Sequence, residues 1–332
     1  MKLAVLALTK GGKHLAQKIA GEVQNCLIIE STNGIAATLK ENWQRFDGFI
    51  CIMATGITVR AIAPLLRDKC QDPCVVCLDE KGAHVISLLS GHLGGANSLA
   101  YTVAAITGGN PVITTSSDTL GLVALDLWAE RQNLAADRQT FTRASSQLVN
   151  SGTLHIYCET EVASLPHGLK QTLDSNSADL IISNRTEYTS RLCFYPRNLV
   201  VGIGCNRNTP MEEFEVALRD LFNDIGCSIF SIRNLASIDV KNDETGLLQF
   251  AEKNRWPISF YSREQINTIS NVTPSEAALK AVGAIGVAEP TALLSAATIN
   301  LLSRKRKWQN ITMAVAEAPF TLSEQVLDPL TT

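Results

Sequence analysis

The segment SGHLGGAN, from Ser90 to Asn97, combines glycines with side chains that can move protons or donate hydrogen bonds. Its glycines are Gly91, Gly94 and Gly95. Glycine lets a backbone approach a ligand closely and leaves N–H groups facing outward at a helix start. His92 lies among them, and the ordinary pKa of histidine, about 6.5, suits a general acid or base. The pattern favours a site for a carboxylate or an oxyanion over a tight turn with a solvated histidine.

Two further loops carry polar groups after apolar runs. In TGITVR, Thr55 is followed by Gly56, which permits a turn, and Arg60 is a charge within an otherwise apolar stretch. The planar fork of arginine pairs well with carboxylates, so a polycarboxylate ligand would explain Arg60, although an ordinary surface arginine explains it equally. TTSSD supplies Thr114, Thr115 and Asp118.

Each of these loops follows a predicted strand, and open α/β sheets bind ligands beyond the carboxyl ends of their strands. We therefore expect SGHLGGAN, TGITVR and TTSSD to lie at one edge of a sheet. Asp79, Glu80 and His84 follow another predicted strand and could add an acid–base pair, with a charged turn as the alternative.

The second half offers weaker candidates. The loop SIDVKNDETG holds Asp239, Lys241, Asp243 and Glu244, and Glu289 begins a helix in GVAEPTALLSAA. Helix capping explains Asp243 and Glu289 reasonably well. Contact of Asp239, Lys241, Glu244 and Glu289 with a substrate is the competing interpretation.

Several common site motifs are missing. The sequence has no P-loop, no complete G-x-G-x-x-G, no G-x-S-x-G and no H-E-x-x-H, which disfavours nucleotide, serine-hydrolase and zinc-protease chemistry. Cys70, Cys74 and Cys77 are the one suggestive cysteine cluster. Cys74 and Cys77 lie three apart on a predicted strand and face opposite sides, so we expect no metal site there.

Apolar runs alternate with helical patterns over much of the chain. In the first half we predict strands at 2–8, 26–30, 48–53, 74–79, 85–89 and 111–115. After residue 198, we predict strands in LVVGIGC, SIFSI, PISFY and ITMAVAEA, and helices in PMEEFEVALRDLFND, GLLQFAEKN and PTALLSAATINLL. Continuously apolar strands between helices indicate mostly parallel sheets.

This alternation predicts an α/β protein of three parts. Residues 1–130 form a mostly parallel three-layer α/β domain, residues 131–196 a small middle domain or linker, and residues 197–332 a second α/β domain. Short strands are expected in the middle part at 153–158, 179–183 and 191–195.

Composition narrows the class of protein. Of the 332 residues, 45% are hydrophobic and 18% charged, which supplies a core and argues against disorder. A net charge of −3 disfavours a broad nucleic-acid surface. No apolar run reaches the roughly 18 residues of a membrane span, and the N-terminus lacks a signal-peptide pattern. We expect a cytoplasmic protein with reduced thiols.

The residues from Thr55 to Asn97, with PVITTSSD after them, closely resemble the N-terminal domain of the CbiG family. VVGIGCNRNT, ASIDVKNDETGL and GVAEPTALLSAA resemble its C-terminal domain, which is also found alone as CobE. The resemblance covers roughly residues 45–130 and 198–318, and the middle region matches no family motif.

The resemblance implies a hydrolase of anaerobic cobalamin biosynthesis that acts on cobalt-precorrin-5A. Such enzymes open a δ-lactone on the macrocycle and release acetaldehyde, which gives cobalt-precorrin-5B. No cofactor is expected, because the substrate brings its own cobalt. Its partners would be this substrate and, transiently, neighbouring pathway enzymes. The apolar strands also allow a homodimer.

Roles for the candidate residues follow from that chemistry. His92 is our predicted base, with Glu80 or His84 as alternatives and Asp118 orienting the histidine. Gly94, Gly95 and Asn97 are predicted oxyanion donors, and Arg60 is predicted to pair with substrate carboxylates. Two alternatives stay open: another tetrapyrrole-modifying enzyme, such as a methyltransferase or mutase, and a non-catalytic carrier of a corrinoid intermediate.

Overall fold

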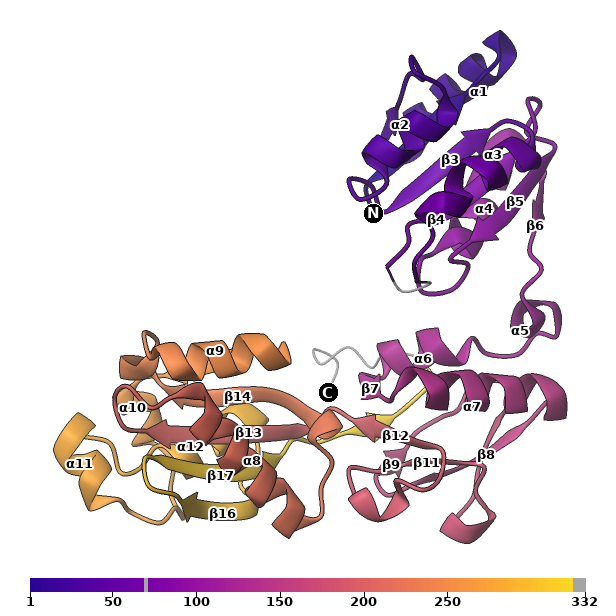
Figure 1. Cartoon of the computed structure of the whole chain (residues 1–332). Coiled ribbons are helices and arrows are strands. Elements are labelled where there is room, and N and C mark those ends of the chain that lie inside the picture. Colours follow the sequence, from indigo (N-terminus) through magenta and orange to yellow (C-terminus); the bar gives the residue numbers. More distant parts are fainter. Residues whose placement is uncertain (69–70, 325–332) are drawn as a thin grey trace. The chain divides into compact units, whose positions relative to one another are not determined.

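The computed structural model describes residues 1–68 and 71–324. The chain divides into two compact units, the first spanning Met1–Leu127 and the second beginning at Trp128 (Figure 1). Each unit is an α/β structure, as the alternating pattern of the sequence predicts. Among the described residues, no helix has the length and apolar character needed to cross a membrane.

A six-stranded sheet, in the order β2-β1-β3-β4-β5-β6, forms the centre of the N-terminal unit. Its strands are β1 (Leu3–Ala7), β2 (Cys26–Ile28), β3 (Gly48–Ile52), β4 (Cys74–Leu78), β5 (His84–Leu89) and β6 (Asn110–Val112). β3 and β4 are buried along their whole length, which explains why their residues are almost all apolar.

Helices cover both faces of this sheet and create the predicted three layers. They are α1 (Lys10–Glu22), α2 (Ile35–Asn42), α3 (Thr55–Ile62) and α4 (Ala96–Thr107), followed by the short α5 (Ser116–Thr119) and α6 (Leu125–Arg131). One core packs Ile19 and Val103, from α1 and α4, against Val5 and Val76. The other packs Leu39 of α2 and residues of α3 against the opposite face.

The direction of the strands reverses within the N-terminal sheet. β2, β1, β3 and β4 are parallel, β5 pairs antiparallel with β4, and β6 runs parallel to β5. The carboxyl ends of β5 and β6 therefore lie at the edge where β1, β3 and β4 begin, which we term the amino edge. The opposite edge, where β1, β3 and β4 end, is termed the carboxyl edge.

A five-stranded sheet with the order β10-β8-β11-β12-β7 occupies the predicted middle part. Its strands are β7 (Leu134–Ala135), β8 (Leu154–Cys158), β10 (Leu169–Gln171), β11 (Leu180–Ile182) and β12 (Cys193–Pro196). β8, β11 and β12 confirm the three strands predicted there. The helix α7 (Arg138–Ser151) is capped at its N-terminus by Asp137, whose side chain accepts a hydrogen bond from the Thr140 N–H.

A third sheet, in the order β15-β14-β13-β17-β16, follows. Its strands are β13 (Leu199–Cys205), β14 (Ile232–Ile238), β15 (Ile258–Tyr261), β16 (Leu301–Lys307) and β17 (Ile311–Glu317). The helices α8 (Met211–Ile225) and α9 (Thr245–Asn254) cover one face, and α12 (Ala288–Ala296) packs on the other. Two short helices, α10 (Arg263–Ile266) and α11 (Glu276–Val282), precede α12.

Two predicted elements of this region are wrong. SIFSI is not a strand: Ser228 caps a 3-10 turn over Ile229–Ser231, and β14 begins only at Ile232. The helix predicted through PTALLSAATINLL ends at Ala296, because Ala297 adopts a left-handed conformation with φ of 50°. The following residues form β16, which pairs with β17 instead.

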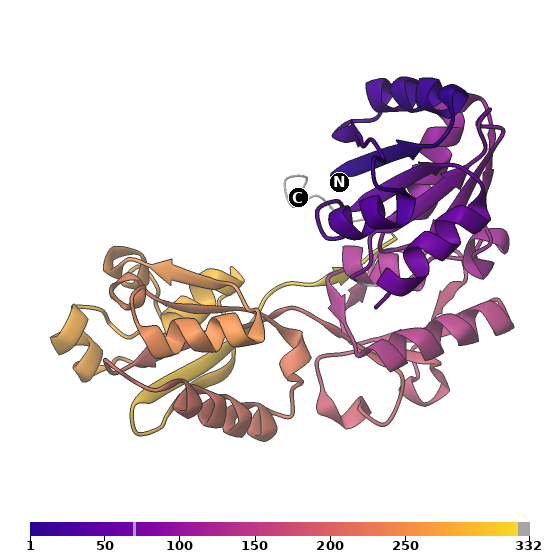
Figure 2. The same cartoon turned by 45° about the horizontal axis from the view of Figure 1, so that its top comes forward.

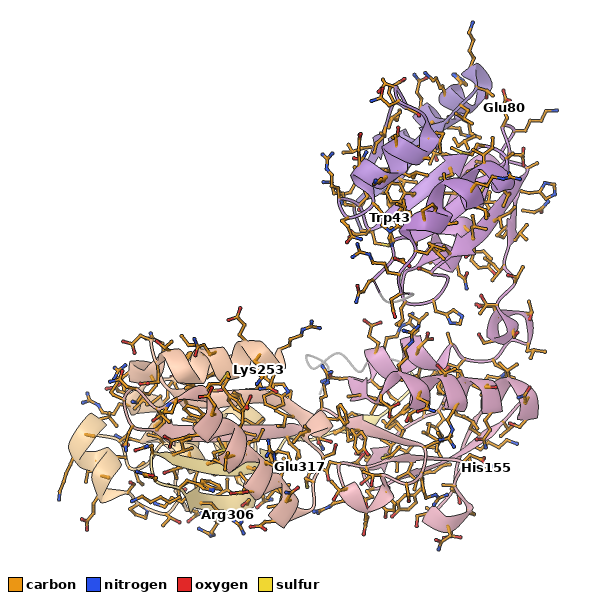
Figure 3. The ribbon with its side chains drawn as sticks, in the orientation of Figure 1. Trp43, Glu80, His155, Lys253, Arg306 and Glu317 are labelled. Carbon is orange, nitrogen blue, oxygen red and sulfur yellow. The ribbon has the colours of Figure 1, made fainter. Side chains whose placement is uncertain are left out.

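The two sheets of the second unit share several contacts. Asn184 and Asn198 each donate a side-chain hydrogen bond of 2.9 Å to Glu317. Glu317 lies at the end of β17 and is labelled in Figure 3. After β17 the chain runs back to the middle part of the second unit (Figure 2), where β18 (Thr321–Leu322) pairs in parallel with β9 (Glu161–Val162) in a separate two-stranded sheet. The C-terminal segment thus helps to hold the two sheets together.

Candidate functional site

The strand reversal places the candidate residues at opposite edges of the N-terminal sheet. SGHLGGAN follows β5 and TTSSD follows β6, so both lie at the amino edge. A hydrogen bond of 3.1 Å from the Ser90 hydroxyl to the carbonyl of Asp72, just before β4, is consistent with this placement. TGITVR follows β3 and lies at the carboxyl edge. The expectation that the three loops share one edge is wrong.

The loop after β5 folds tightly on itself. Ser90 has a φ of 56°, an uncommon conformation for a residue with a side chain, and the φ of Gly95 is 87°. A Cβ on Gly94 would lie 2.3 Å from that of Ser90, and one on Gly91 would lie 2.7 Å from the Asn97 Oδ1. Gly94 therefore needs to be glycine for the loop to close, independently of any ligand, whereas a side chain on Gly91 would displace the end of Asn97.

Most of the predicted oxyanion donors have partners inside the loop network. The Gly95 N–H donates to the His92 carbonyl over 2.8 Å. The side-chain amide of Asn97 donates to Asp118 Oδ2 at 3.0 Å and to Thr115 Oγ1 at 3.3 Å, while its Oδ1 accepts from Ser87 at 2.6 Å. Asn97 therefore positions Asp118, and Gly95 and Asn97 are poor candidates for oxyanion donors in this arrangement.

The His92 ring lies between two carboxylates. Its Nε2 is 3.0 Å from Asp118 Oδ2, and its Nδ1 is 3.3 Å from Asp126 Oδ1. The Ser117 hydroxyl is 3.4 Å from Nε2. The hydrogen bond to Asp126 raises the pKa of His92 most, partial burial opposes it, and Asp118 adds to the rise. The expected pairing of Asp118 with His92 is present in the structure.

Asp126 is a neighbour of His92 that sequence reasoning missed. It lies in the first turn of α6, in the unremarkable sequence LVALDLWAE. An aspartate at a helix start is normally explained by the helix dipole, so its type and position carry no signal of a partner in a distant loop.

The carboxyl edge holds a cavity of ≈ 520 Å³. Its apolar walls include Ile52, Ile57 and Ile86. The polar residues around it are Thr9, Thr55, Asp79, Glu80 and His84. The structure therefore brings four residues named from the sequence, Thr55, Asp79, Glu80 and His84, around one cavity, away from His92 and Asp118.

Asp79 organises the turn between β4 and β5. Its carboxylate accepts backbone hydrogen bonds from Lys81 at 2.9 Å, Ala83 at 3.3 Å and His84 at 2.8 Å. Desolvation raises the pKa of Asp79, but the bonds from the backbone outweigh it and hold that pKa below its ordinary value. Because His84 Nδ1 lies 3.7 Å from Asp79, the charged turn considered from the sequence describes this segment well.

Glu80 extends from the same turn toward the start of α1 (Figure 3). Its Oε1 lies 2.0 Å from the place where a side-chain Cβ would stand on Gly11. Across the edge, the guanidinium of Arg60 donates to the carbonyl of Gly56 at 3.0 Å and is exposed. Arg60 can leave this bond to pair with a carboxylate, so its predicted role stays a prediction.

The candidates of the third sheet are largely engaged within the fold. Glu289 is 1% exposed, and its two oxygens accept hydrogen bonds from Thr273 and from the Lys305 N–H. These bonds give Glu289 a structural role, and its contact with a substrate stays a prediction. Lys241 and Glu244 form a buried ion pair of 3.3 Å.

Beside that ion pair, the remaining charges of the loop also have partners. Asp239 accepts from the Val240 N–H at 2.7 Å. Arg207 pairs with Asp243, which is exposed and does not cap α9 by its side chain. Substrate binding by Asp239, Lys241 and Glu244 stays a prediction.

The cysteine cluster behaves as apolar material where it is described. Cys74 and Cys77 are buried in β4, and burial raises the pKa of the Cys74 thiol to about 12. Cys70 lies outside the described residues. Within residues 1–68 and 71–324, no group of three or more histidine, cysteine or acidic side chains is arranged to hold a metal ion.

Comparison with known proteins finds two family matches and several relatives. Residues 37–118 match Cobalamin synthesis G N-terminal, and residues 199–316 match Cobalamin synthesis G C-terminus. The cobalt-precorrin-5A hydrolase of Priestia megaterium is 32% identical, over 96% of this chain and 95% of that protein. That of Salmonella typhimurium strain LT2 is 31% identical, over 95% of this chain and 97% of its own.

A solved structure is also similar to part of this chain. It is that of CobE, a protein from the cobalamin (vitamin B12) biosynthetic pathway, which is 32% identical with a TM-score of 0.35. The match covers 36% of this chain and 89% of CobE. The full-length relatives extend the similarity across both units, including the middle sheet that carries no motif.

Proposed function

This chain belongs to the cobalamin synthesis G (CbiG) family, and from that membership we propose that it is a cobalt-precorrin-5A hydrolase of cobalamin biosynthesis. The observation that carries the proposal is the identity of 31–32% to two proteins of that name over nearly the whole of each chain. The match of both family regions, in the same order, supports it further.

The proposed reaction opens the δ-lactone of cobalt-precorrin-5A with one water and then releases acetaldehyde to give cobalt-precorrin-5B. Ring opening breaks the carbonyl C–O bond, and the departing oxygen takes a proton to become a hydroxyl. Release of acetaldehyde removes that hydroxyl proton, while the electron pair of the broken C–C bond stays with the macrocycle. Both steps need a group that exchanges protons near neutral pH.

We place this chemistry at the amino edge. His92 is the residue of that edge whose ordinary pKa suits proton exchange, and its partner Asp118 is itself held by a hydrogen bond from Asn97. Glu80 and His84, around the cavity at the carboxyl edge, are the alternative proton-exchange groups. In that alternative, Arg60, which also lies at the carboxyl edge, is proposed to meet a carboxylate of the substrate.

No resident cofactor takes part in this proposal, because the cobalt belongs to the substrate. We also propose a cytoplasmic location, with reduced cysteines and no nucleic-acid or membrane partner. A homodimer and transient contacts with neighbouring pathway enzymes complete the proposal. The buried thiols, several with pKa values raised by burial, are compatible with a reducing compartment.

The direct test is acetaldehyde release during anaerobic incubation of the purified chain with cobalt-precorrin-5A. We expect the wild type to release one acetaldehyde for each cobalt-precorrin-5B formed, and His92→Ala to release it far more slowly. Substrate binding without acetaldehyde release would instead identify a carrier of the intermediate. Consumption that depends on S-adenosylmethionine would identify a methyltransferase.

A further inference from the structure

We infer that Asp126 is the positioning residue of the amino edge, which holds the His92 ring by Nδ1 so that Nε2 exchanges the proton with the substrate. The inference rests on the proposed function and deepens it. It also changes the expected roles, because the sequence suggests Asp118 as the residue that orients the histidine. Asp118 becomes the partner that Nε2 leaves when substrate binds.

The two carboxylates differ in where they lie. Asp126 has a side chain 17% exposed and meets Nδ1, whereas Asp118 is 32% exposed and meets Nε2. The imidazole itself is 18% exposed. A ligand arriving from solvent therefore reaches the Nε2 side more readily than the Nδ1 side. In the general pattern of acid–base histidines, a buried carboxylate on one ring nitrogen fixes the ring while the other nitrogen reacts.

The two contacts also determine the protonation state of His92 before the reaction begins. Two carboxylates on two ring nitrogens are both satisfied only when each nitrogen carries a proton. Among residues 1–68 and 71–324, the structure places Asp118 of α5 and Asp126 of α6 against this ring, and the nearby Ser117 hydroxyl does not titrate. His92 therefore begins as an imidazolium and acts first as an acid, rather than as the base predicted from the sequence.

The proton transfers of the proposed reaction then form a cycle that returns His92 to its starting protonation state. Asp118, released from Nε2, accepts a proton from the attacking water and passes it to solvent. Nε2 gives its proton to the lactone ring oxygen as the C–O bond breaks and the electron pair moves to that oxygen. The neutral imidazole, still held by Asp126, then takes the hydroxyl proton as acetaldehyde leaves, which restores the imidazolium.

The test compares Asp126→Asn with Asp126→Glu and with a structural control, Asp137→Asn at the start of α7. Asp126→Asn should lower kcat by about 10²-fold and leave KM within about twofold, since positioning acts on the transition state. The fall of kcat at high pH should move to lower pH. Asp126→Glu should recover part of the rate, and Asp137→Asn should alter stability without moving the pH profile.

NMR titration of the His92 ring gives a second readout that needs no substrate. Its pKa should fall in Asp126→Asn and stay where it is in Asp137→Asn. An unmoved His92 titration, or a pH profile like that of Asp137→Asn, would overturn the inference. If the wild type releases no acetaldehyde, the proposed function fails, and the titration still tests the Asp126 contact.

Discussion

The two edges of the N-terminal sheet carry similar residue types, a histidine with acidic residues, in different surroundings. At the amino edge, His92, Asp118, Asp126, Ser117 and Asn97 form a network of contacts between 3.0 and 3.4 Å. At the carboxyl edge, Glu80 and His84 stand around an open cavity with apolar walls. A closed network fixes protonation states and geometry, whereas an open cavity offers room and little positioning.

The largest expected effect is a difference in the rate of acetaldehyde release between a variant of the amino edge and a variant of the carboxyl edge. His92→Ala removes the proposed proton-exchange group and should slow acetaldehyde release by about 10²–10⁴-fold. Glu80→Gln keeps the shape of its side chain and should change the rate less than about threefold. Steady-state acetaldehyde assays at one pH decide between them. The reverse pattern, with Glu80→Gln inactive and His92→Ala active, would move the chemistry to the carboxyl edge.

A second comparison uses one glycine from each edge. Gly94→Ala would bring a Cβ within 2.3 Å of the Ser90 Cβ and 2.7 Å of its carbonyl oxygen, so the tight loop must shift. We expect a loss of about 1–3 kcal/mol in the free energy of unfolding, with slower acetaldehyde release. Urea denaturation measures the first quantity.

Gly11→Ala is the matched control. Its Cβ would meet only the flexible end of the Glu80 side chain, at 2.0 Å from Oε1, and the carboxylate can swing away. Alanine also stabilises the first turn of α1 relative to glycine, by up to about 1 kcal/mol. The free energy of unfolding should therefore stay the same or rise. Equal losses in the two variants would show that the loop after β5 is no more constrained than α1.

The reversal that creates the two edges could have been predicted from the sequence. Only the five residues 79–83 separate β4 from β5. A parallel connection needs about a dozen residues or more, so two strands this close must form an antiparallel hairpin. The strands themselves were predicted correctly, because their continuous apolar runs are unambiguous. Assigning directions as well would have placed His92 and Glu80 at opposite edges.

The contact of Asp126 with His92 could not have been predicted in this way. Thirty-four positions of chain separate the two residues, and no spacing rule connects a loop with a helix that follows another strand and a short helix. The pairing of His92 with Asp118 was within reach, since both follow neighbouring parallel strands, β5 and β6. The structural role of Glu289 could not be predicted for a different reason. The sequence does not distinguish a buried carboxylate with backbone partners from an exposed one.

The smallest expected effect is a difference between His92 of the amino edge and Asp79 of the carboxyl edge in how their contributions to stability depend on pH. The pKa of His92 is raised in the folded protein, so its contribution is fully present below the unfolded value of about 6.5 and is lost as pH rises through the folded pKa. The pKa of Asp79 is lowered, so its contribution is present above about pH 3.9 and is lost as pH falls through the folded value.

Two substitutions make this difference measurable. His92→Gln keeps a hydrogen-bond donor without a charge, and it should destabilise the protein near pH 6 but progressively less toward pH 9. Asp79→Asn should destabilise the protein near neutral pH and progressively less below about pH 4. The effect should be small, because the Asp79 side chain is 43% exposed. Urea denaturation across pH gives both profiles. A His92→Gln effect that stays constant between about pH 6 and 9 would show that His92 carries no extra proton in the fold, and the acid-first order of proton transfer would then be wrong.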